Sequence, residues 1–180
     1  MKGRKSFIFI AEAAIFTALA LVLDWVCNLL FTYLWPNGGS ISIAMVPIFI
    51  MGYKWGPKGG FLVGFLVGTI QLLWSSYLLN PLQVCLDYVF AYGVCGVASL
   101  FYPLINTTNK LLKHIYICVG IFIGGILRLL CAVLAGVFFW ETKFWPSLVY
   151  NGTYMIPSIF VCMIITCILV ESLKTFMQKN

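Results

Sequence analysis

Charged residues are scarce in this 180-residue chain: they make up 9% of it, and only five are acidic. Soluble globular domains carry charge on about a quarter of their residues. Hydrophobic residues, by contrast, reach 62% here. These proportions exclude an ordinary soluble domain and predict an integral membrane protein.

Histidine is almost absent. The only one, His114, falls between Lys110 and Lys113 in a polar stretch between apolar runs. A histidine there cannot pair with a serine or cysteine inside the membrane, so nucleophilic catalysis has no support. The seven cysteines lie in apolar runs without CxxC or Cys/His ligand spacing, and we expect them to pack as small hydrophobic residues rather than bind a metal.

Long apolar runs separated by breakers are what the sequence does contain. Because a span needs about 20 apolar residues, the chain has room for about six helices in a single membrane domain covering residues 1–180. The fold class predicted is therefore an all-α bundle. The second run is short, which indicates a helix buried among the others. The expected helices cover residues 7–34, 41–53, 59–74, 81–102, 115–140 and 146–173.

The third run places Gly60, Gly64 and Gly68 four residues apart. This spacing puts three positions without side chains on one helical face, where another helix packs closely. A phosphate-binding glycine loop would need a strand before it and a Lys-Ser/Thr pair after it, and the run has neither.

Basic residues concentrate in alternate connections. With a formal net charge of +6, the chain carries nearly all of its Lys and Arg at the N-terminus, around residues 54–58 and 110–113, and in the C-terminal tail. We interpret this as a topology signal rather than as a nucleic-acid surface, with both termini cytoplasmic.

Ionisable groups inside hydrocarbon are costly and need a reason. Four fall within the expected spans: Glu12, Asp24, Asp87 and Arg128. Glu12 is close enough to a helix end to reach the interface. Asp24 and Arg128 lie deeper and have opposite signs, and one interpretation is a mutual ion pair.

Asp87 belongs to a polar and aromatic group at the outer ends of the helices. If its helix begins at Pro81, Asp87 lies about 9 Å inside that end. A carboxylate among aromatic faces suits a planar, cationic or hydrogen-bonding ligand. An interfacial aromatic belt is the alternative, although a belt does not explain Asp87 and Asn151. The candidate ligand-binding residues are Tyr77, Asp87, Tyr88, Trp140, Trp145, Tyr150 and Asn151.

Several stretches resemble the thiamin-specific substrate-binding (S) components of energy-coupling factor (ECF) transporters. They are residues 12–18 (EAAIFTA), 38–47 (GGSISIAMVP), 77–88 (YLLNPLQVCLDY) and 149–154 (VYNGTY), together with Trp140. The resemblance implies six helices in a bacterial cell membrane, an outward-facing vitamin pocket and no catalytic activity. It also implies thiamin as the transported ligand, with no cofactor.

The resemblance assigns roles to particular residues. Tyr77, Tyr88, Trp140 and Asn151 match the family's binding residues in kind, and Asp87 stands where a Glu is common. Aromatic residues would stack on the two rings of thiamin, the carboxylate would meet its cationic or aminopyrimidine part, and Asn151 would hydrogen-bond a ring.

Docking is implied as well. The face carrying Ala14 and Ala18 would contact a membrane scaffold protein that carries two ATPase subunits. The chain has no Walker motif of its own, so the energy for transport must come from such partners.

Three positions depart from the family pattern. Ala132 stands where a histidine is expected, Pro146 where a tyrosine is expected, and Gly38 where some members have tryptophan. Each loses a possible ligand contact, with Trp145 and Tyr150 as candidate substitutes. The ligand therefore stays open among thiamin, its phosphates, its pyrimidine precursor and another aromatic vitamin. A channel or a purely structural bundle is the remaining alternative, but it predicts polar residues running through the membrane.

Overall fold

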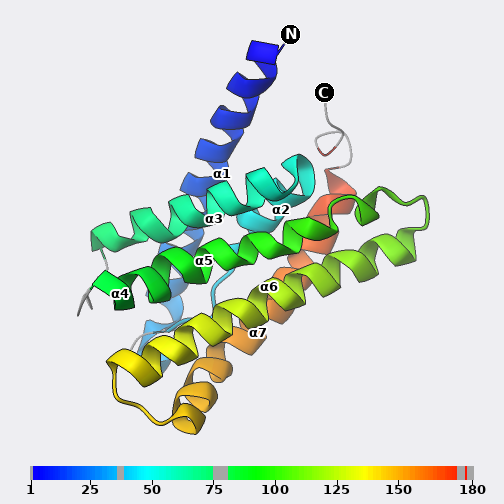
Figure 1. Ribbon diagram of the computed structural model, residues 1–180. Coiled ribbons are helices and arrows are strands. Elements are labelled where there is room, and N and C mark those ends of the chain that lie inside the picture. Colours follow the sequence, from blue (N-terminus) through cyan, green and yellow to red (C-terminus); the bar gives the residue numbers. More distant parts are fainter. Residues whose placement is uncertain (1, 36–38, 75–80, 174–176, 178–180) are drawn as a thin grey trace.

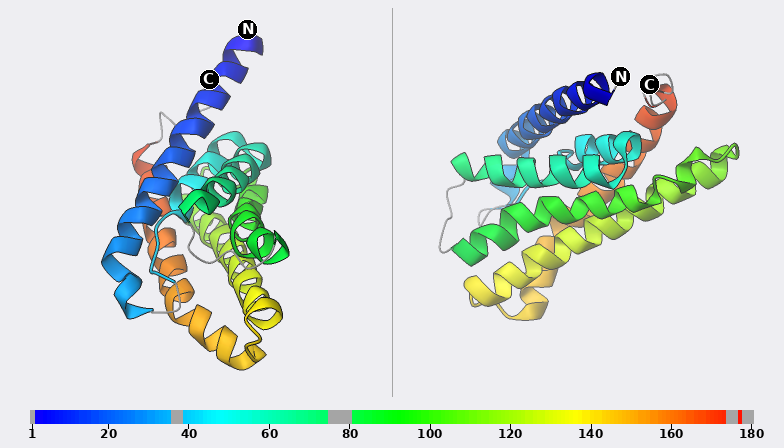
Figure 2. Two further views of the ribbon diagram at one scale, coloured as in Figure 1. Left: turned by 90° about the vertical axis from the view of Figure 1, so that its left-hand side faces the viewer. Right: turned by 45° about the horizontal axis from the view of Figure 1, so that its top comes forward.

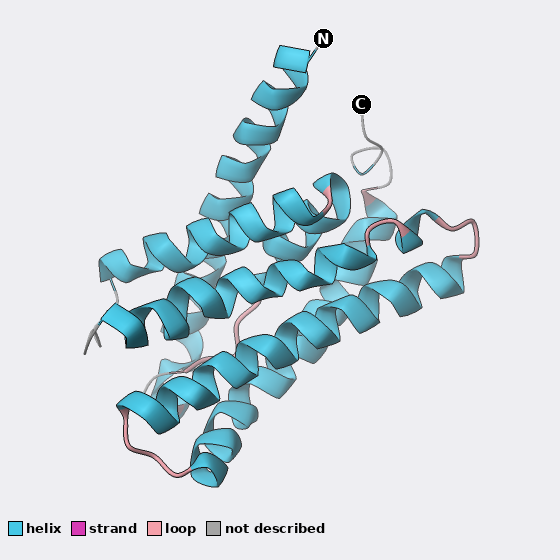
Figure 3. Cartoon of the chain, in the orientation of Figure 1, coloured by secondary structure: helices cyan, strands magenta, loops and turns pink. Residues whose placement is uncertain are grey.

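The computed structural model describes residues 2–35, 39–74, 81–173 and 177. All regular structure in these residues is helical, and the remainder is loops and turns (Figure 3). The principal helices are α1 (Lys2–Phe31), α2 (Met45–Trp55), α3 (Pro57–Gln71), α6 (Lys110–Phe139) and α7 (Phe144–Ser172). Short 3-10 turns extend α1 through Thr32–Leu34 and α3 through Leu72–Trp74, and another covers Leu104–Asn106.

The fourth helical span is continuous but changes its winding. It comprises α4 (Pro81–Val84), the π-helical η3 (Cys85–Phe90), α5 (Ala91–Gly93) and the 3-10 segment η4 (Val94–Phe101). Four helices in the described residues are long and apolar enough to cross a membrane: Gly3–Phe31, Pro81–Phe101, Lys110–Phe139 and Phe144–Ser172.

Helices α2 and α3 are shorter and pack inside the bundle. The α2 side chains from Met45 to Lys54 are all buried, which explains why this helix is apolar on every side. The bundle therefore combines long and short helices, and α1 protrudes from one side of it (Figures 1 and 2).

The glycine face of α3 makes the predicted close contact. A Cβ atom on Gly64 would lie 2.5 Å from the carbonyl oxygen of Tyr92, and one on Gly68 would collide with the carbonyl of Tyr88. Gly60 meets Ser99 and Gly52 in the same way. The backbones of α3 and of the fourth span therefore touch directly, which fixes the position of the segment that carries Asp87.

Four helices begin earlier than the sequence suggests, including α1 at Lys2 and α3 at Pro57, whereas α2 begins later, at Met45 rather than at residue 41. Helix α6 starts at Lys110 rather than Ile115, because the Asn109 side chain accepts hydrogen bonds from the amides of Leu111 (3.0 Å) and Leu112 (3.3 Å). Helix α7 starts at Phe144 rather than Pro146, and the proline falls within its first turn, where a missing amide hydrogen costs little.

The basic segments gather at one end of the bundle. The N-terminus, the α2–α3 junction, the start of α6 and the end of α7 lie at one end (Figure 1). Lys54 bonds Glu12 at 2.6 Å, joining α2 to α1, and Lys113 approaches Glu171 at 3.5 Å, joining α6 to α7. Glu12 therefore does not extend to the membrane interface as expected, because it forms an ion pair with Lys54 inside the protein.

Candidate ligand-binding site

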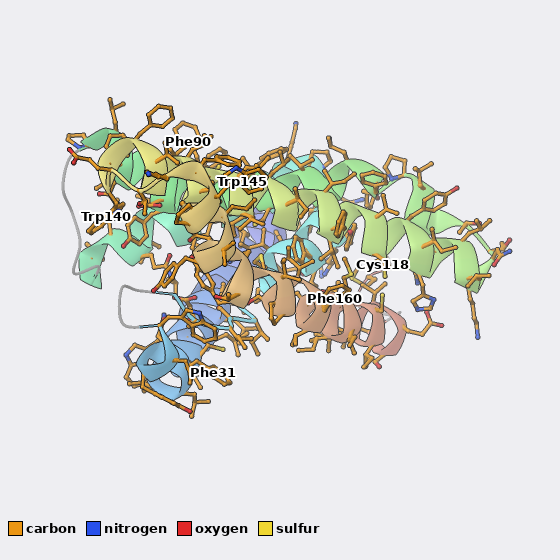
Figure 4. The ribbon with its side chains drawn as sticks, turned by 90° about the horizontal axis from the view of Figure 1, so that it is seen from below. Phe31, Phe90, Cys118, Trp140, Trp145 and Phe160 are labelled. Carbon is orange, nitrogen blue, oxygen red and sulfur yellow. The ribbon has the colours of Figure 1, made fainter. Side chains whose placement is uncertain are left out.

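Asp87 and Trp140 meet at the other end of the bundle. Asp87 lies in the π-helical segment η3, and its carboxylate accepts a hydrogen bond from Gln83 Nε2 at 2.6 Å. Trp140, the residue that follows α6, lies close to the Asp87 carboxylate. Figure 4 shows Trp140 at this end, with Cys118 toward the opposite end of α6. π-Helical turns are rare and frequently lie at functional sites.

The first turns of α7 supply a second polar group. Asn151 donates to the Ser147 carbonyl at 2.9 Å, and its side-chain oxygen accepts a hydrogen bond from the Tyr154 hydroxyl. The rings of Tyr150 and Tyr154 pack edge to face with centroids 6.3 Å apart. Asp87 and Tyr88 of the fourth span lie in the neighbourhood of Tyr154.

The connection after α1 covers Tyr154 from a third direction. Trp35 Nε1 donates to the Thr153 hydroxyl at 2.8 Å, and its ring lies edge-on to Tyr154 at 5.9 Å. Gly39 has a φ of +118°, and a Cβ there would lie 2.6 Å from the Tyr154 ring. Glycine is required at this position for both its conformation and its lack of a side chain.

The structure brings together most of the candidate residues. Asp87, Tyr88, Trp140, Tyr150 and Asn151 belong to one cluster, in which all except Trp140 are half-buried. Trp145 is different: it is 71% exposed, and its ring packs edge-on to Phe144 at 5.6 Å. Tyr77 lies outside the described residues.

Sequence reasoning missed Tyr154, Gln83 and Trp35. Tyr154 lies four residues after Tyr150, a spacing that places both on one helical face and could have identified it. Gln83 likewise precedes Asp87 by four residues. Trp35 had no such signal, because its contacts with α7 join residues more than one hundred positions apart.

Two of the three positions that depart from the family pattern lie in the described part of the chain, on α6 and α7. Ala132 is half-buried on α6, two helical turns before Trp140, and Pro146 is exposed in the first turn of α7. Gly38 lies outside the described residues.

Asp24 lies deeper and accepts four hydrogen bonds. The donors are Asn28 (3.0 Å), Ser42 (2.9 Å), Tyr92 (3.0 Å) and the Gln71 side-chain amide. Ser42 precedes α2, Gln71 ends α3 and Tyr92 belongs to α5, so the hydrogen bonds of this carboxylate link α1 to three other segments of the bundle.

Arg128 does not pair with Asp24, and the ion-pair interpretation is wrong. Its guanidinium carbon lies 3.9 Å from the centroid of the Tyr92 ring, and none of the described carboxylates comes within ion-pair distance of it. The reason is geometric: Tyr92 stands between the two charges, and neutral donors occupy the Asp24 oxygens.

Comparison with known proteins agrees with this architecture. Residues 10–178 match the model of a protein family described as "Thiamine transporter protein (Thia_YuaJ)". The chain belongs to this family.

Two curated members are similar over the whole chain. "Thiamine transporter ThiT" of Bacillus subtilis is 34% identical, with 100% of this chain and 99% of that protein aligned. The protein of the same name from Lacticaseibacillus paracasei is 25% identical, with 100% and 96% aligned.

The fold of this thiamine transporter family member is also found in a solved structure. A structure described as ThiT from Listeria monocytogenes superimposes with a TM-score of 0.81 at 24% identity, covering 96% of this chain and 98% of that one. The chain is therefore a multi-pass membrane protein of bacterial cell membranes, and it belongs to a family of transport proteins rather than enzymes.

Proposed function

We propose that this protein is the thiamin-binding S component of an ECF-type uptake transporter, and that thiamin binds among Asp87, Trp140 and the α7 tyrosines. The observation that carries the proposal is the proximity of Asp87 to Trp140, which places a carboxylate beside an aromatic side chain from another helix. Thiamin contains a cationic ring and an aminopyrimidine, so it needs both kinds of partner.

Each side chain has a role in this proposal. The Asp87 carboxylate balances the ligand's charge or accepts from its amino group. Tyr88, Trp140 and Tyr150 offer ring faces for stacking, and Asn151 offers an amide. Tyr77 and Trp145 also stay in the proposed set, and Trp145 is exposed at the start of α7.

The substitutions at Ala132, Pro146 and Gly38 bear on both the affinity and the choice of ligand. A lost buried hydrogen bond commonly costs about 1 to 3 kcal/mol. Tyr154 supports the site instead, because its hydroxyl orients Asn151 and its ring contacts Trp35. Thiamin stays the first choice, and its precursor or another aromatic vitamin is the alternative.

The proposal includes six membrane spans in one domain with both termini cytoplasmic. The short helices α2 and α3 complete the bundle between the four longer ones. The basic segments at the N-terminus, the α2–α3 junction and the start of α6 share one end, and positive residues favour the cytoplasmic side. The Asp87 cluster then faces outward.

Docking to a scaffold protein would use α1. Ala14 and Ala18 are exposed one turn apart, beside Ile15 (63% exposed) and Leu19 (45% exposed). Small residues at this spacing let another helix approach closely. The scaffold would carry two ATPase subunits, whose ATP hydrolysis drives transport.

Titration of the purified, ligand-stripped protein with thiamin, followed by tryptophan fluorescence, tests this function. We expect saturable quenching that Trp140→Phe weakens and Trp25→Phe leaves intact, because Trp25 is 57% exposed on α1 and is not among the proposed ligand-binding residues. Quenching by the pyrimidine precursor or another vitamin, but not by thiamin, would reassign the ligand. No response to any of them would contradict the proposal.

A further inference from the structure

An open surface cavity lies at the basic end of the bundle. It has a volume of about 220 Å³ and is lined by Lys5, Ser6 and Phe9 of α1, Trp55 at the end of α2 and Lys58 in the first turn of α3. We call these five residues the basic cavity. It lies at the opposite end of the bundle from the Asp87 cluster, so the proposed thiamin site does not account for it.

The aromatic wall of the basic cavity is held in place. The rings of Phe9 and Trp55 pack edge to face with centroids 5.2 Å apart. Trp55 Nε1 donates to Glu12 Oε2 at 2.6 Å, while Lys54 bonds the other Glu12 oxygen at 2.6 Å. The nearest carboxylate therefore has both oxygens engaged and does not neutralise Lys5 or Lys58.

Two uncompensated cations remain on the cavity rim. Neither Lys5 nor Lys58 forms an ion pair with any described carboxylate. The 15-residue helix α3 also begins here, with no acidic residue in its first turn and no side-chain cap at Gly56. Its N-terminus adds partial positive charge beside Lys58.

We propose that the basic cavity binds the phosphate of an anionic phospholipid headgroup. Two lysines and a helix N-terminus supply the charge that a phosphate needs, and Ser6 supplies a hydroxyl donor. A lipid is favoured over a soluble phosphate because apolar surface adjoins the cavity: Ile10 lies four residues after Ser6 on the same helical face and is 64% exposed. Acyl chains can lie along this surface. The inference goes beyond thiamin binding and does not depend on it.

Native mass spectrometry of the delipidated protein tests the proposal. The protein is titrated with phosphatidylglycerol and, separately, with phosphatidylcholine of the same acyl chains. We expect preferential binding of phosphatidylglycerol, which Lys5→Gln combined with Lys58→Gln weakens by about 30-fold. Lys110→Gln combined with Lys143→Gln changes the net charge equally at exposed positions outside the cavity and should bind like the wild type. Lys5→Arg combined with Lys58→Arg should retain binding.

Three results would overturn the proposal. The first is equal binding of the two lipids, and the second is equal loss in the cavity and control variants. The third is a result in which inorganic phosphate displaces phosphatidylglycerol and, on its own, protects the protein against thermal unfolding as much as the lipid does. That result would assign the cavity to a soluble anion. Monodisperse elution and a wild-type melting temperature show that each variant is folded.

Discussion

Tyr92 lies between Asp24 and Arg128 and contacts both of them. Its hydroxyl donates to an Asp24 oxygen at 3.0 Å, and the guanidinium carbon of Arg128 lies over its ring, 3.9 Å from the centroid. A single aromatic residue thus separates an anion from a cation while stabilising each, the first through a hydrogen bond and the second through its ring face. Two variants distinguish these contributions.

Tyr92→Phe removes the hydroxyl alone. Asp24 then loses a donor and the Gln71 amide loses an acceptor at 3.0 Å. We expect a loss of about 0.5 to 2 kcal/mol of stability, visible as a lower melting temperature in detergent. Tyr33→Phe is the control, because Tyr33 is 78% exposed. Equal melting temperatures for the two variants would show that the network contributes nothing.

The ring of Tyr92 should determine what Arg128 contributes. Arg128→Met is measured in three backgrounds: wild type, Tyr92→Phe and Tyr92→Leu. Because phenylalanine keeps the ring, the effect of Arg128→Met should be the same in the first two backgrounds. It should differ by about 1 to 2 kcal/mol when leucine removes the ring. An identical effect in all three would contradict the cation–π contact.

Gly64→Ala should destabilise the bundle. The new Cβ would lie 2.5 Å from the Tyr92 carbonyl oxygen, so α3 and the fourth span must move apart, at about 1 to 3 kcal/mol. Gly152→Ala is the matched control, since its Cβ would find its nearest neighbour at 3.6 Å and alanine favours the helix. Thermal unfolding of both variants compares them; a Gly64→Ala variant as stable as Gly152→Ala would refute the close contact.

Enlarging Ala14 and Ala18 to leucine should separate binding from uptake. Both positions are exposed on α1, so the bulk should block a partner helix without disturbing the Asp87 cluster. We expect wild-type thiamin affinity in the purified protein and loss of thiamin uptake in cells that supply the partner subunits. Val119→Phe combined with Val149→Phe adds bulk at exposed positions of α6 and α7 and should leave uptake unchanged. Normal uptake by the α1 variant would exclude this docking face.

The helical, multi-pass character of the protein could be predicted from sequence because it depends on apolar runs and breakers. The close approach at Gly64 and Gly68 could be predicted as well, since a four-residue spacing fixes a helical face. The π-helical and 3-10 winding of the fourth span could not be predicted. Nothing in the residues around Asp87 distinguishes a π-helical turn from an α-helical one, and that turn sets where the carboxylate points.

The candidate site, likewise, could be predicted from the sequence only in part. Asp87 and Trp140 could be placed at one end because helix ends alternate across a membrane. The Asp24 network was beyond sequence reasoning, because opposite charges suggested a pair and only the packing puts Tyr92 between them. Trp35 was missed for a related reason: its contacts with Thr153 and Tyr154 join α7 to a distant connection.

The most direct test of the account is the thiamin affinity of Asp87→Asn, measured by isothermal titration calorimetry on ligand-stripped protein. Glu141→Gln is the control, because Glu141 is an exposed acid next to Trp140 and at the same end of the bundle. The account predicts about 10- to 100-fold weaker binding for Asp87→Asn and a change of less than about threefold for Glu141→Gln. If Asp87→Asn is as stable as the wild type and binds thiamin equally tightly, the site is not where we place it.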